Sequence, residues 1–377
     1  MKTILIISFS DLKNDPRVHR QIRFLKDRYR VTTIGLEDPQ QSGVEFIPIK
    51  RQSHGAVAKI SRALAYKLGR FERLYWSLYR FEQPLARLAE RRFDLVIAND
   101  LGALPLAVRI AGNAKSMLDA HEYTPRQFED RWGWNFFFRE FNEYLCRTYL
   151  PRCHRMTTVS TGIAKEYQKN FAVQAEVITN SSEYFDLRPA AAVDPSRLRL
   201  IHHGSASPSR SLEIMIRLMK RNATNMTLDL MLMPTHPGYL RRLKRKAGRD
   251  PRISFPPPLP LAGIVPFLNR YDVGVCIFKP TTFNLLHVLP NKFFEFIQAR
   301  LAVLSGPSPE MAELIRRYDC GIIADDFSLP ALGRALAGLT RERIEYYKNQ
   351  SHQASEKLSA EKNRLRLLAL VRELIGE

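Results

Sequence analysis

One segment of the sequence has the residue types that bind a phosphate group. The apolar run at 198–203 ends at Gly204, and small or polar residues follow up to Ser211, with Arg210 just before an expected helix. Small residues let backbone amides approach a phosphate, and an arginine near a helix start adds a forked set of donors. The same pattern also fits an ordinary turn with a solvated Arg210, because turns are rich in small and polar residues.

A second segment places a carboxylate in an otherwise apolar helix. Pro290, Asn291 and Lys292 begin the segment, and Glu295 follows one turn later among phenylalanines. A carboxylate in that position can accept two hydrogen bonds from the diol of a ribose. Glu295 is equally consistent with an ordinary glutamate that the helix dipole favours near a helix N-terminus.

The elements that position these residues follow from the hydrophobic pattern. Short β-branched runs alternate with stretches of helical period, which predicts βαβ units and parallel sheets. The expected strands of the first half are 3–9, 31–35, 44–48, 95–98, 116–119, 156–159 and 176–178. Those of the second half are 198–203, 227–232, 253–255, 273–278, 302–304 and 321–324. The fold class is therefore α/β, with ligands expected beyond the carboxyl ends of the strands.

The domain organisation is predicted from length and linker signals. A chain of 377 residues exceeds the usual size of one hydrophobic core. The stretch 186–197 contains two prolines and is typical of a linker. We therefore expect one domain over 1–186, a second over 187–345, and a C-terminal helix over 346–377 that packs back toward the first domain.

On these residues the sequence resembles the family-four glycosyltransferases, and the resemblance runs over nearly the whole chain. In that family a glycine, a basic residue directly after it and a second basic residue six positions after it bind the donor diphosphate. The matching positions here are Gly204, Ser205 and Arg210, so the first basic residue is missing. The family also has two glutamates eight positions apart, and the second binds the ribose. Glu295 occupies the second position and His287 the first.

The segment around Glu295 resembles a recognised branch of the family with the pattern Pro-Asn-Lys-x-x-Glu. This resemblance implies that Asn291 and Lys292 belong to the donor site together with Glu295. It also implies that the histidine at 287 changes the contacts to the donor sugar and keeps a catalytic position.

The first half carries two further likenesses to the family. The segment from Asp119 to Glu122 resembles its Asp-x-His-Glu motif, whose histidine points into the cleft near the donor sugar, which implies catalytic roles for His121 and Glu122. The segment 15–21 resembles the family's opening helix, which implies that Arg17 and Arg20 lie with Asp119 on the acceptor side. Without the family, His121 also fits an ordinary polar group at a strand end.

The resemblance implies the GT-B architecture, with two doubly wound Rossmann-like domains that face each other across a cleft. It further implies transfer of a sugar from a nucleotide-sugar donor with retention of configuration, so that no carboxylate nucleophile is needed. No Asp-x-Asp pair follows an expected strand, and we therefore expect neither a metal nor another cofactor. Fixed cations and backbone amides then stabilise the leaving diphosphate.

Charge and patterning suggest a membrane surface as a partner. The net charge is +20, and residues 50–92 contain eleven Lys or Arg against three acidic residues, interleaved with aromatic residues. Such a mixture is typical of a surface that contacts anionic lipid. It also fits a helix pair whose aromatic side chains lie in the core. No apolar run is long enough to span a bilayer, so we expect a cytoplasmic protein that binds a membrane peripherally. With a membrane surface as partner, we expect a lipid-linked or cell-envelope saccharide acceptor.

Three other functions fit parts of the sequence. A nucleic-acid-binding protein fits the charge, but no recognised motif of that class occurs, so nucleic acid is not expected as a partner. A nucleotide-sugar epimerase needs paired carboxylates for proton transfer, and no such pair stands out. A catalytically inactive sugar-nucleotide sensor is suggested by Ser205 and His287, which depart from the family pattern.

Overall fold

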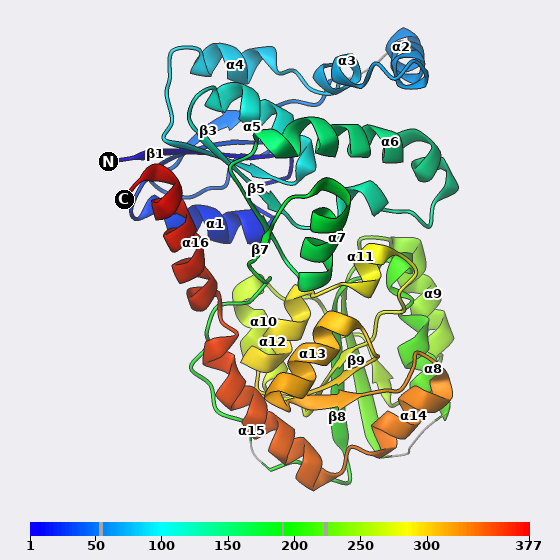
Figure 1. Ribbon diagram of the computed structural model, residues 1–377. Coiled ribbons are helices and arrows are strands. Elements are labelled where there is room, and N and C mark those ends of the chain that lie inside the picture. The colour runs from blue at the N-terminus through cyan, green and yellow to red at the C-terminus, as the bar shows by residue number, and fades with distance from the viewer. Residues whose placement is uncertain (53–55, 191, 222–224) are drawn as a thin grey trace. The chain divides into compact units, whose positions relative to one another are not determined.

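The computed structural model describes residues 1–52, 56–190, 192–221 and 225–377 (Figure 1). The chain divides into two compact units. Unit 1 comprises Met1–Ile178, Thr282–Asn284 and Arg364–Glu377, and unit 2 comprises Thr179–Thr281 and Leu285–Asn363. Each unit contains one parallel sheet with helices on both faces.

The sheet of unit 1 has the strand order β3-β2-β1-β4-β5-β6-β7, and its neighbouring strands pair in parallel. Its inner strand β1 is an apolar run that is buried on both faces, as expected for a doubly wound sheet. The strand bounds are β1 Thr3–Ser8, β2 Arg30–Gly35, β3 Glu45–Pro48, β4 Leu95–Asn99, β5 Lys115–Ala120, β6 Arg155–Thr158 and β7 Glu176–Val177.

Helices cover both faces of this sheet, with α1 and α16 on one side and α4, α5 and α6 on the other (Figure 1). Helix α1 begins at Pro16, and the side chain of Asp15 caps it by accepting hydrogen bonds from the backbone N–H groups of Arg17 and Val18. The helix bounds are α1 Pro16–Lys26, α2 Ala56–Lys67, α3 Phe71–Trp76, α4 Glu82–Leu88, η1 Leu101–Ala103, α5 Leu104–Ala111, η2 Thr124–Arg126, α6 Trp132–Tyr149, η3 Leu150–Arg152, α7 Thr161–Phe171 and α16 Ala360–Ile375.

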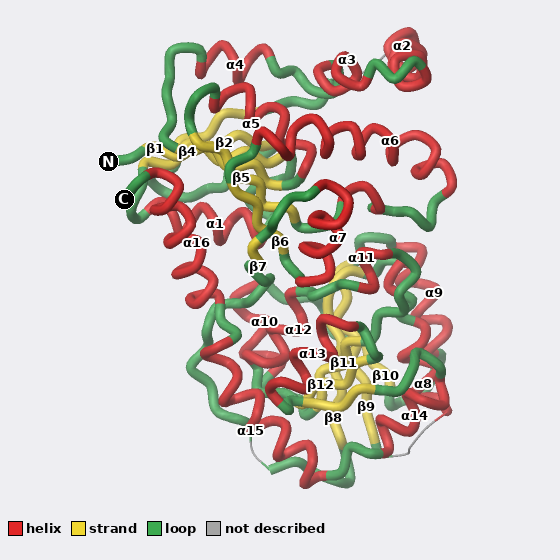
Figure 2. The backbone as a smooth tube through the Cα atoms, in the orientation of Figure 1, coloured by secondary structure: helices red, strands yellow, loops and turns green. Residues whose placement is uncertain are grey.

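The sheet of unit 2 has the order β10-β9-β8-β11-β12-β13, again parallel (Figure 2). Its strands are β8 Leu198–Ser205, β9 Met226–Met233, β10 Ile253–Ser254, β11 Val273–Cys276, β12 Ala302–Ser305 and β13 Gly321–Ile323. Its helices are η4 Pro208–Arg210, α8 Glu213–Arg221, α9 Pro237–Ala247, α10 Leu261–Leu268, α12 Asn291–Gln298, α13 Pro309–Tyr318, α14 Leu329–Ala337 and α15 Arg341–Lys357. Helix α11 Phe283–Leu286 begins in unit 1 and ends in unit 2.

Unit 2 has two apolar layers, one on each face of its sheet. Leu200 packs in the layer that holds residues of α8, α9 and α14, whereas its neighbour Ile201 packs in the layer of α10, α12 and α13. This alternation follows from the pleat, which points successive side chains to opposite faces. The prediction of an α/β fold with two doubly wound sheets is confirmed.

The C-terminal segment, expected as one helix over 346–377, forms the two helices α15 and α16. Residues 364–377 group with unit 1, where Arg364 donates a hydrogen bond to Asp27 and Arg155 pairs with Glu373. The short segment Thr282–Asn284 also groups with unit 1. There the side-chain amide of Asn284 accepts a hydrogen bond from the N–H of Tyr123 and donates one to its carbonyl oxygen.

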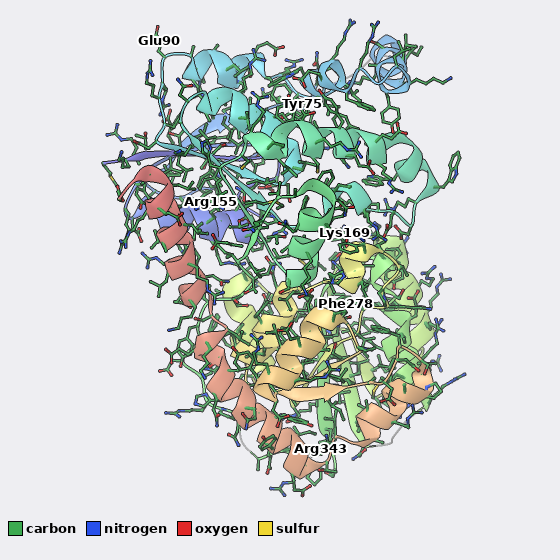
Figure 3. All side chains as sticks on the ribbon, viewed as in Figure 1. Tyr75, Glu90, Arg155, Lys169, Phe278 and Arg343 are labelled. Atoms are coloured by element: carbon green, nitrogen blue, oxygen red, sulfur yellow. The ribbon has the colours of Figure 1, made fainter. Side chains whose placement is uncertain are left out.

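The aromatic side chains of residues 50–92 do not face outward, so that part of the membrane prediction is wrong. Tyr75 and Phe81 are buried and stack in the core of unit 1, where Tyr75 is labelled in Figure 3. Others that pack against the same core are Tyr66, Phe71, Trp76 and Tyr79. The alternative, a helix pair with its aromatic residues in the core, is correct for these side chains. None of the helices in the described ranges combines the length and apolarity needed to cross a bilayer.

Candidate functional sites in the two units

In unit 2, strand β8 ends in a backbone conformation that suits glycine. Gly204 has a φ of +121°, which side chains of L-residues rarely allow. A Cβ built at this position would lie 2.9 Å from Nζ of Lys292. Ser205, the next residue, instead turns its hydroxyl to Thr235 at 2.6 Å. The absence of a side chain at 204 therefore leaves room for the lysine directly beside the backbone.

Two cations meet at the ring of Phe278, which is labelled in Figure 3. The guanidinium carbon of Arg210 lies 5.0 Å from the ring centroid, and Nζ of Lys292 lies 5.1 Å from it. Burial of Lys292, together with the charge of Arg210, lowers the pKa of Lys292 to about 7. The sequence has a serine at 205, where the family has its first basic residue, and Lys292 brings a second cation to the same loop in space.

Glu295 lies one turn after Lys292 on α12 and faces His203 of β8. Its Oε2 is 3.1 Å from Nε2 of His203, and both side chains are largely buried. The histidine ring also packs edge-on against Phe296. The carboxylate is therefore held in place by its neighbours, as a specific ligand contact requires.

Among the polar atoms of unit 2 that are buried without a hydrogen-bond partner in the described part of the chain, two lie at helix starts. They are Oδ1 of Asn291, at the first position of α12, and Oγ of Ser308, at the start of α13. Buried polar atoms are usually paired, so such atoms indicate a place where a ligand or water binds. Both lie at helix N-termini, where backbone N–H groups favour an anion.

His287 pairs with an acidic residue that is distant in sequence. Its Nδ1 lies 3.1 Å from Oε1 of Glu310, which is in the first turn of α13 and is buried. Position 287 therefore carries a histidine where the family has a glutamate, but a carboxylate stands directly beside it.

In unit 1, His121 lies between two carboxylates beyond the end of β5. Its Nε2 is 3.2 Å from Oδ2 of Asp119, and its Nδ1 is 3.6 Å from Oδ1 of Asp100. The backbone N–H of His121 also donates to Asp100, at 3.3 Å. The imidazole is almost fully buried, whereas the Asp100 carboxylate is half exposed.

The two carboxylates outweigh burial in setting the charge of His121. Burial and the nearby charge of Arg17 both lower its pKa, but Asp100 and Asp119 raise it to about 9. Partial desolvation opposes the charge of Asp100, but the imidazolium lowers the pKa of this carboxylate to about 2. His121 is thus an imidazolium at neutral pH, with Asp100 as its exposed counterion.

Asp100 adopts a positive φ of 66°, which is uncommon for a residue other than glycine. It directly follows β4, and its N–H donates to the carbonyl oxygen of Asp119 at 2.9 Å. Strained backbone of this kind persists where the surroundings hold it, and it is frequent at functional sites.

The remaining predicted residues of unit 1 have different surroundings. Glu122 accepts a hydrogen bond from Gln127 at 2.8 Å, so its carboxylate is engaged outside the His121 group. Arg17, in the first turn of α1, influences the charge of His121. Arg20 is partly buried and lies three residues later on the same helix, which places it near the face of Arg17.

Sequence reasoning assigned no site role to several polar groups around these residues, although Asn99 and Asp100 match weaker positions of the family pattern and also fit turn and cap residues. In unit 1, Gln21 donates to Asp119 at 3.3 Å and accepts from Asn99 at 2.9 Å, and Thr157 donates to Asp119 at 2.9 Å. A signal was available, because Asn99, Asp119 and Thr157 are register partners at the carboxyl ends of β4, β5 and β6. In unit 2, His202, His203 and Phe278 were missed, since an apolar-looking strand does not reveal which way its last residues point.

The comparisons with known proteins agree with this architecture. Residues 17–181 match the family model described as Glycosyltransferase Family 4. No curated protein matches the chain. Sucrose-phosphate synthase from Thermosynechococcus elongatus superimposes with a TM-score of 0.74 at 12% identity, and the match covers 100% of both chains.

Two further solved structures are similar over nearly their whole length. WaaG, a glycosyltransferase involved in lipopolysaccharide biosynthesis, matches with a TM-score of 0.66 at 11% identity, covering 99% of this chain and 100% of that one. Anabaena Alr3699/HepE, in complex with UDP and glucose, matches with a TM-score of 0.69 at 14% identity, covering 98% and 99%. At these identities the likeness shows the fold, and this chain has the α/β fold of the GT-B glycosyltransferases.

Proposed function

We propose that the protein is a glycosyltransferase that takes a sugar from a nucleotide-sugar donor and transfers it with retention of configuration. The observation that carries this proposal is the group formed by Gly204, Arg210, Lys292 and Glu295 in unit 2. In this group, Arg210 and Lys292 place two cations near the backbone of Gly204, which has no side chain. The carboxylate of Glu295 lies one turn after Lys292 on the same helix. The match of residues 17–181 to a glycosyltransferase family model supports the same reaction.

The donor diphosphate binds to Arg210 and Lys292 at the end of β8, and the N-termini of α12 and α13 add backbone N–H groups. These charges neutralise the diphosphate as it leaves, so the residues present supply the electrostatic stabilisation that transfer requires. Glu295 accepts hydrogen bonds from the ribose hydroxyls. Oγ of Ser308 and Oδ1 of Asn291, both buried without partners in the described part of the chain, then gain ligand contacts: the serine hydroxyl donates to the diphosphate, and the amide oxygen accepts from a hydroxyl of the donor.

We assign the His121 group of unit 1 to the acceptor. A fixed imidazolium stabilises negative charge that develops nearby, while the half-exposed carboxylate of Asp100 accepts a hydrogen bond from a hydroxyl. With retention, the acceptor approaches on the face that the diphosphate leaves, and its proton passes to the departing phosphate oxygen. Asp119 holds the imidazole in place, and Gln21 and Thr157 in turn donate hydrogen bonds to the Asp119 carboxylate.

The acceptor that we propose is lipid-linked or a cell-envelope saccharide, reached from the cytoplasmic face of a membrane. Ile60, Leu64 and Leu68 are exposed at intervals of four residues along and just beyond α2, and Lys67 and Arg70 are exposed beside them. An apolar ridge flanked by cations complements an anionic lipid surface. WaaG, which is similar in fold, acts in lipopolysaccharide biosynthesis.

A thermal-shift screen against UDP-, GDP- and ADP-sugars tests the donor proposal. A ligand that binds only the folded protein raises its melting temperature, so at least one nucleotide sugar is expected to stabilise the wild type. Hydrolysis of that donor without acceptor then separates an active transferase from a sensor. Lack of stabilisation by every compound of the panel would contradict the proposal.

A further inference from the structure

His202 holds Lys292 against Gly204 in unit 2. Nδ1 of His202 is 2.7 Å from the carbonyl oxygen of Val275, and because a carbonyl only accepts hydrogen bonds, Nδ1 carries the ring proton. Nε2 is then free of a proton and accepts from Nζ of Lys292 at 3.1 Å. His202 is completely buried, so this arrangement of the ring is fixed by the fold.

The surroundings of Lys292 disfavour its charge in the absence of a ligand. Arg210 of η4 adds like charge, and the Cys276 thiol of β11 is neutral because burial raises its pKa to about 12. Glu295 is the carboxylate that acts on Lys292, and it is paired with His203 at 3.1 Å. His202 accepts a hydrogen bond but brings no negative charge, and burial drives its own pKa well below the ordinary value.

We propose that a donor diphosphate binds unit 2 together with one proton, which Lys292 takes up, and that His202 is the positioning residue for this coupling. The inference rests on the proposed function, because it assigns the diphosphate to the Gly204 loop. The proton comes from solvent and stays on Nζ, and no bond of the ligand is broken. The ligand supplies the negative charge that makes the ammonium form favourable beside Arg210.

Calorimetry with UDP-glucose tests the proton uptake. UDP-glucose is a suitable probe because its diphosphate is esterified at both ends and does not titrate near neutral pH. We expect the binding enthalpy at about pH 8.5 to depend on the ionisation enthalpy of the buffer, corresponding to nearly one proton taken up, and at about pH 5.5 to be independent of it. Above about pH 7 the affinity is expected to fall by up to about tenfold per pH unit.

The lysine is tested by two matched substitutions. Lys292→Arg keeps a permanent positive charge, so binding is expected to persist while proton uptake at about pH 8.5 disappears. Lys279→Arg changes an exposed lysine just beyond β11 and is expected to behave as the wild type. Equal proton uptake in Lys292→Arg and the wild type would overturn the assignment to Lys292.

The role of His202 is tested by the pH at which affinity begins to fall. His202→Leu removes the acceptor of the Lys292 ammonium, so this midpoint is expected to move down by about one pH unit. His202→Gln can donate to Val275 and accept from Lys292, and it is expected to restore the wild-type midpoint. If His202→Leu does not fold, His202→Asn, which is too short to reach Lys292, replaces it in the comparison. A midpoint unchanged in folded variants would overturn the role of His202, since a purely structural loss lowers affinity equally at every pH.

The outcomes separate this inference from the proposed function. If the enthalpy of UDP-glucose binding at about pH 8.5 is the same in buffers of different ionisation enthalpy, and the affinity does not depend on pH, the proton coupling is contradicted and the proposed transferase activity is not affected. Failure of UDP-glucose and of every other nucleotide sugar to bind would overturn the proposed function, and this inference with it.

Discussion

His121 and Asp119 are two residues apart in sequence, and their side chains pair at 3.2 Å beyond the end of β5. Asp100 closes the group from the other side of the imidazole at 3.6 Å. Because the histidine pKa is raised in the folded state, its stabilising contribution is fully present below the unfolded pKa of about 6.5. It is lost as pH rises through the folded pKa of about 9.

We therefore predict that the free energy of unfolding decreases between about pH 6.5 and 9 by about 1–3 kcal/mol through His121 alone. His121→Gln should remove this part of the pH dependence. His236→Gln, at the start of α9, serves as the control. Urea unfolding at a series of pH values measures the effect, and an identical slope in wild type and His121→Gln would show that the imidazole is not charged in the folded protein.

Glu295→Gln should weaken donor binding about tenfold, or about 1.4 kcal/mol, without loss of the fold, because a neutral amide oxygen accepts the ribose hydroxyls less strongly than a carboxylate. Calorimetry with the donor from the thermal-shift screen measures this change. Glu313→Gln changes an exposed glutamate on α13 and provides the comparison. Donor affinity equal to that of the wild type would remove Glu295 from the donor site.

Arg210→Ala should lower kcat about a hundredfold and raise the donor dissociation constant less than tenfold, because the charge on the leaving diphosphate grows toward the transition state. Steady-state kinetics combined with direct binding measurements separates the two effects. Arg241→Ala, on the exposed face of α9, controls for the lost charge. If binding is lost in proportion and kcat is unchanged, Arg210 acts on the bound ground state instead.

Reversing Lys67, Arg70 and Arg73 to glutamate should reduce binding to anionic vesicles while leaving activity on a soluble acceptor analogue intact. The set omits Arg62, which is engaged with Ser77, and Lys59, whose side chain lies outside the described residues. Attraction to an anionic leaflet is screened over about 8 Å at physiological salt, so wild-type binding should also weaken as salt rises.

Vesicle flotation measures this binding, and reversal of Arg241, Lys244 and Arg245 on α9 gives the same charge change elsewhere. Equal loss in both variants would indicate a general effect of net charge. If the wild-type protein does not float with anionic vesicles at low salt, the exposed apolar and basic residues along and just beyond α2 have no role in membrane docking.

The fold was predictable because its strands are buried runs with clear boundaries. The expected strand 95–98 forms as Leu95–Asn99, and 302–304 forms as Ala302–Ser305. The end of β11 was placed two residues too far, because Ile277 and Phe278 continue the apolar pattern after pairing stops at Cys276. The apolar pattern of a sequence indicates which residues are buried, and here buried residues continue beyond the last residue that pairs with a neighbouring strand.

The contacts of the candidate sites were less predictable than the elements. The sequence shows Lys292 and Gly204 separately, but their proximity depends on how α12 docks on the end of β8. The partners His203 for Glu295 and Glu310 for His287 likewise come from other elements. The aromatic residues of 50–92 were predicted to contact lipid, and they pack in the core. A mixture of basic and aromatic residues occurs both in amphipathic helices that pack on a core and in those that bind lipid, so composition does not distinguish the two.

Residues 364–377 belong to unit 1 although they follow unit 2 in the sequence, so proteolysis between the two units does not divide unit 1 from unit 2 cleanly. A single proteolytic nick between residues 178 and 179 yields a fragment, 179–377, that still carries the end of α16. That end keeps its hydrogen bond from Arg364 to Asp27 and its pairing of Glu373 with Arg155. We therefore expect the two fragments to stay together after cleavage, held by this helix and by Asn284, whose side-chain amide forms two hydrogen bonds with Tyr123 of the other fragment.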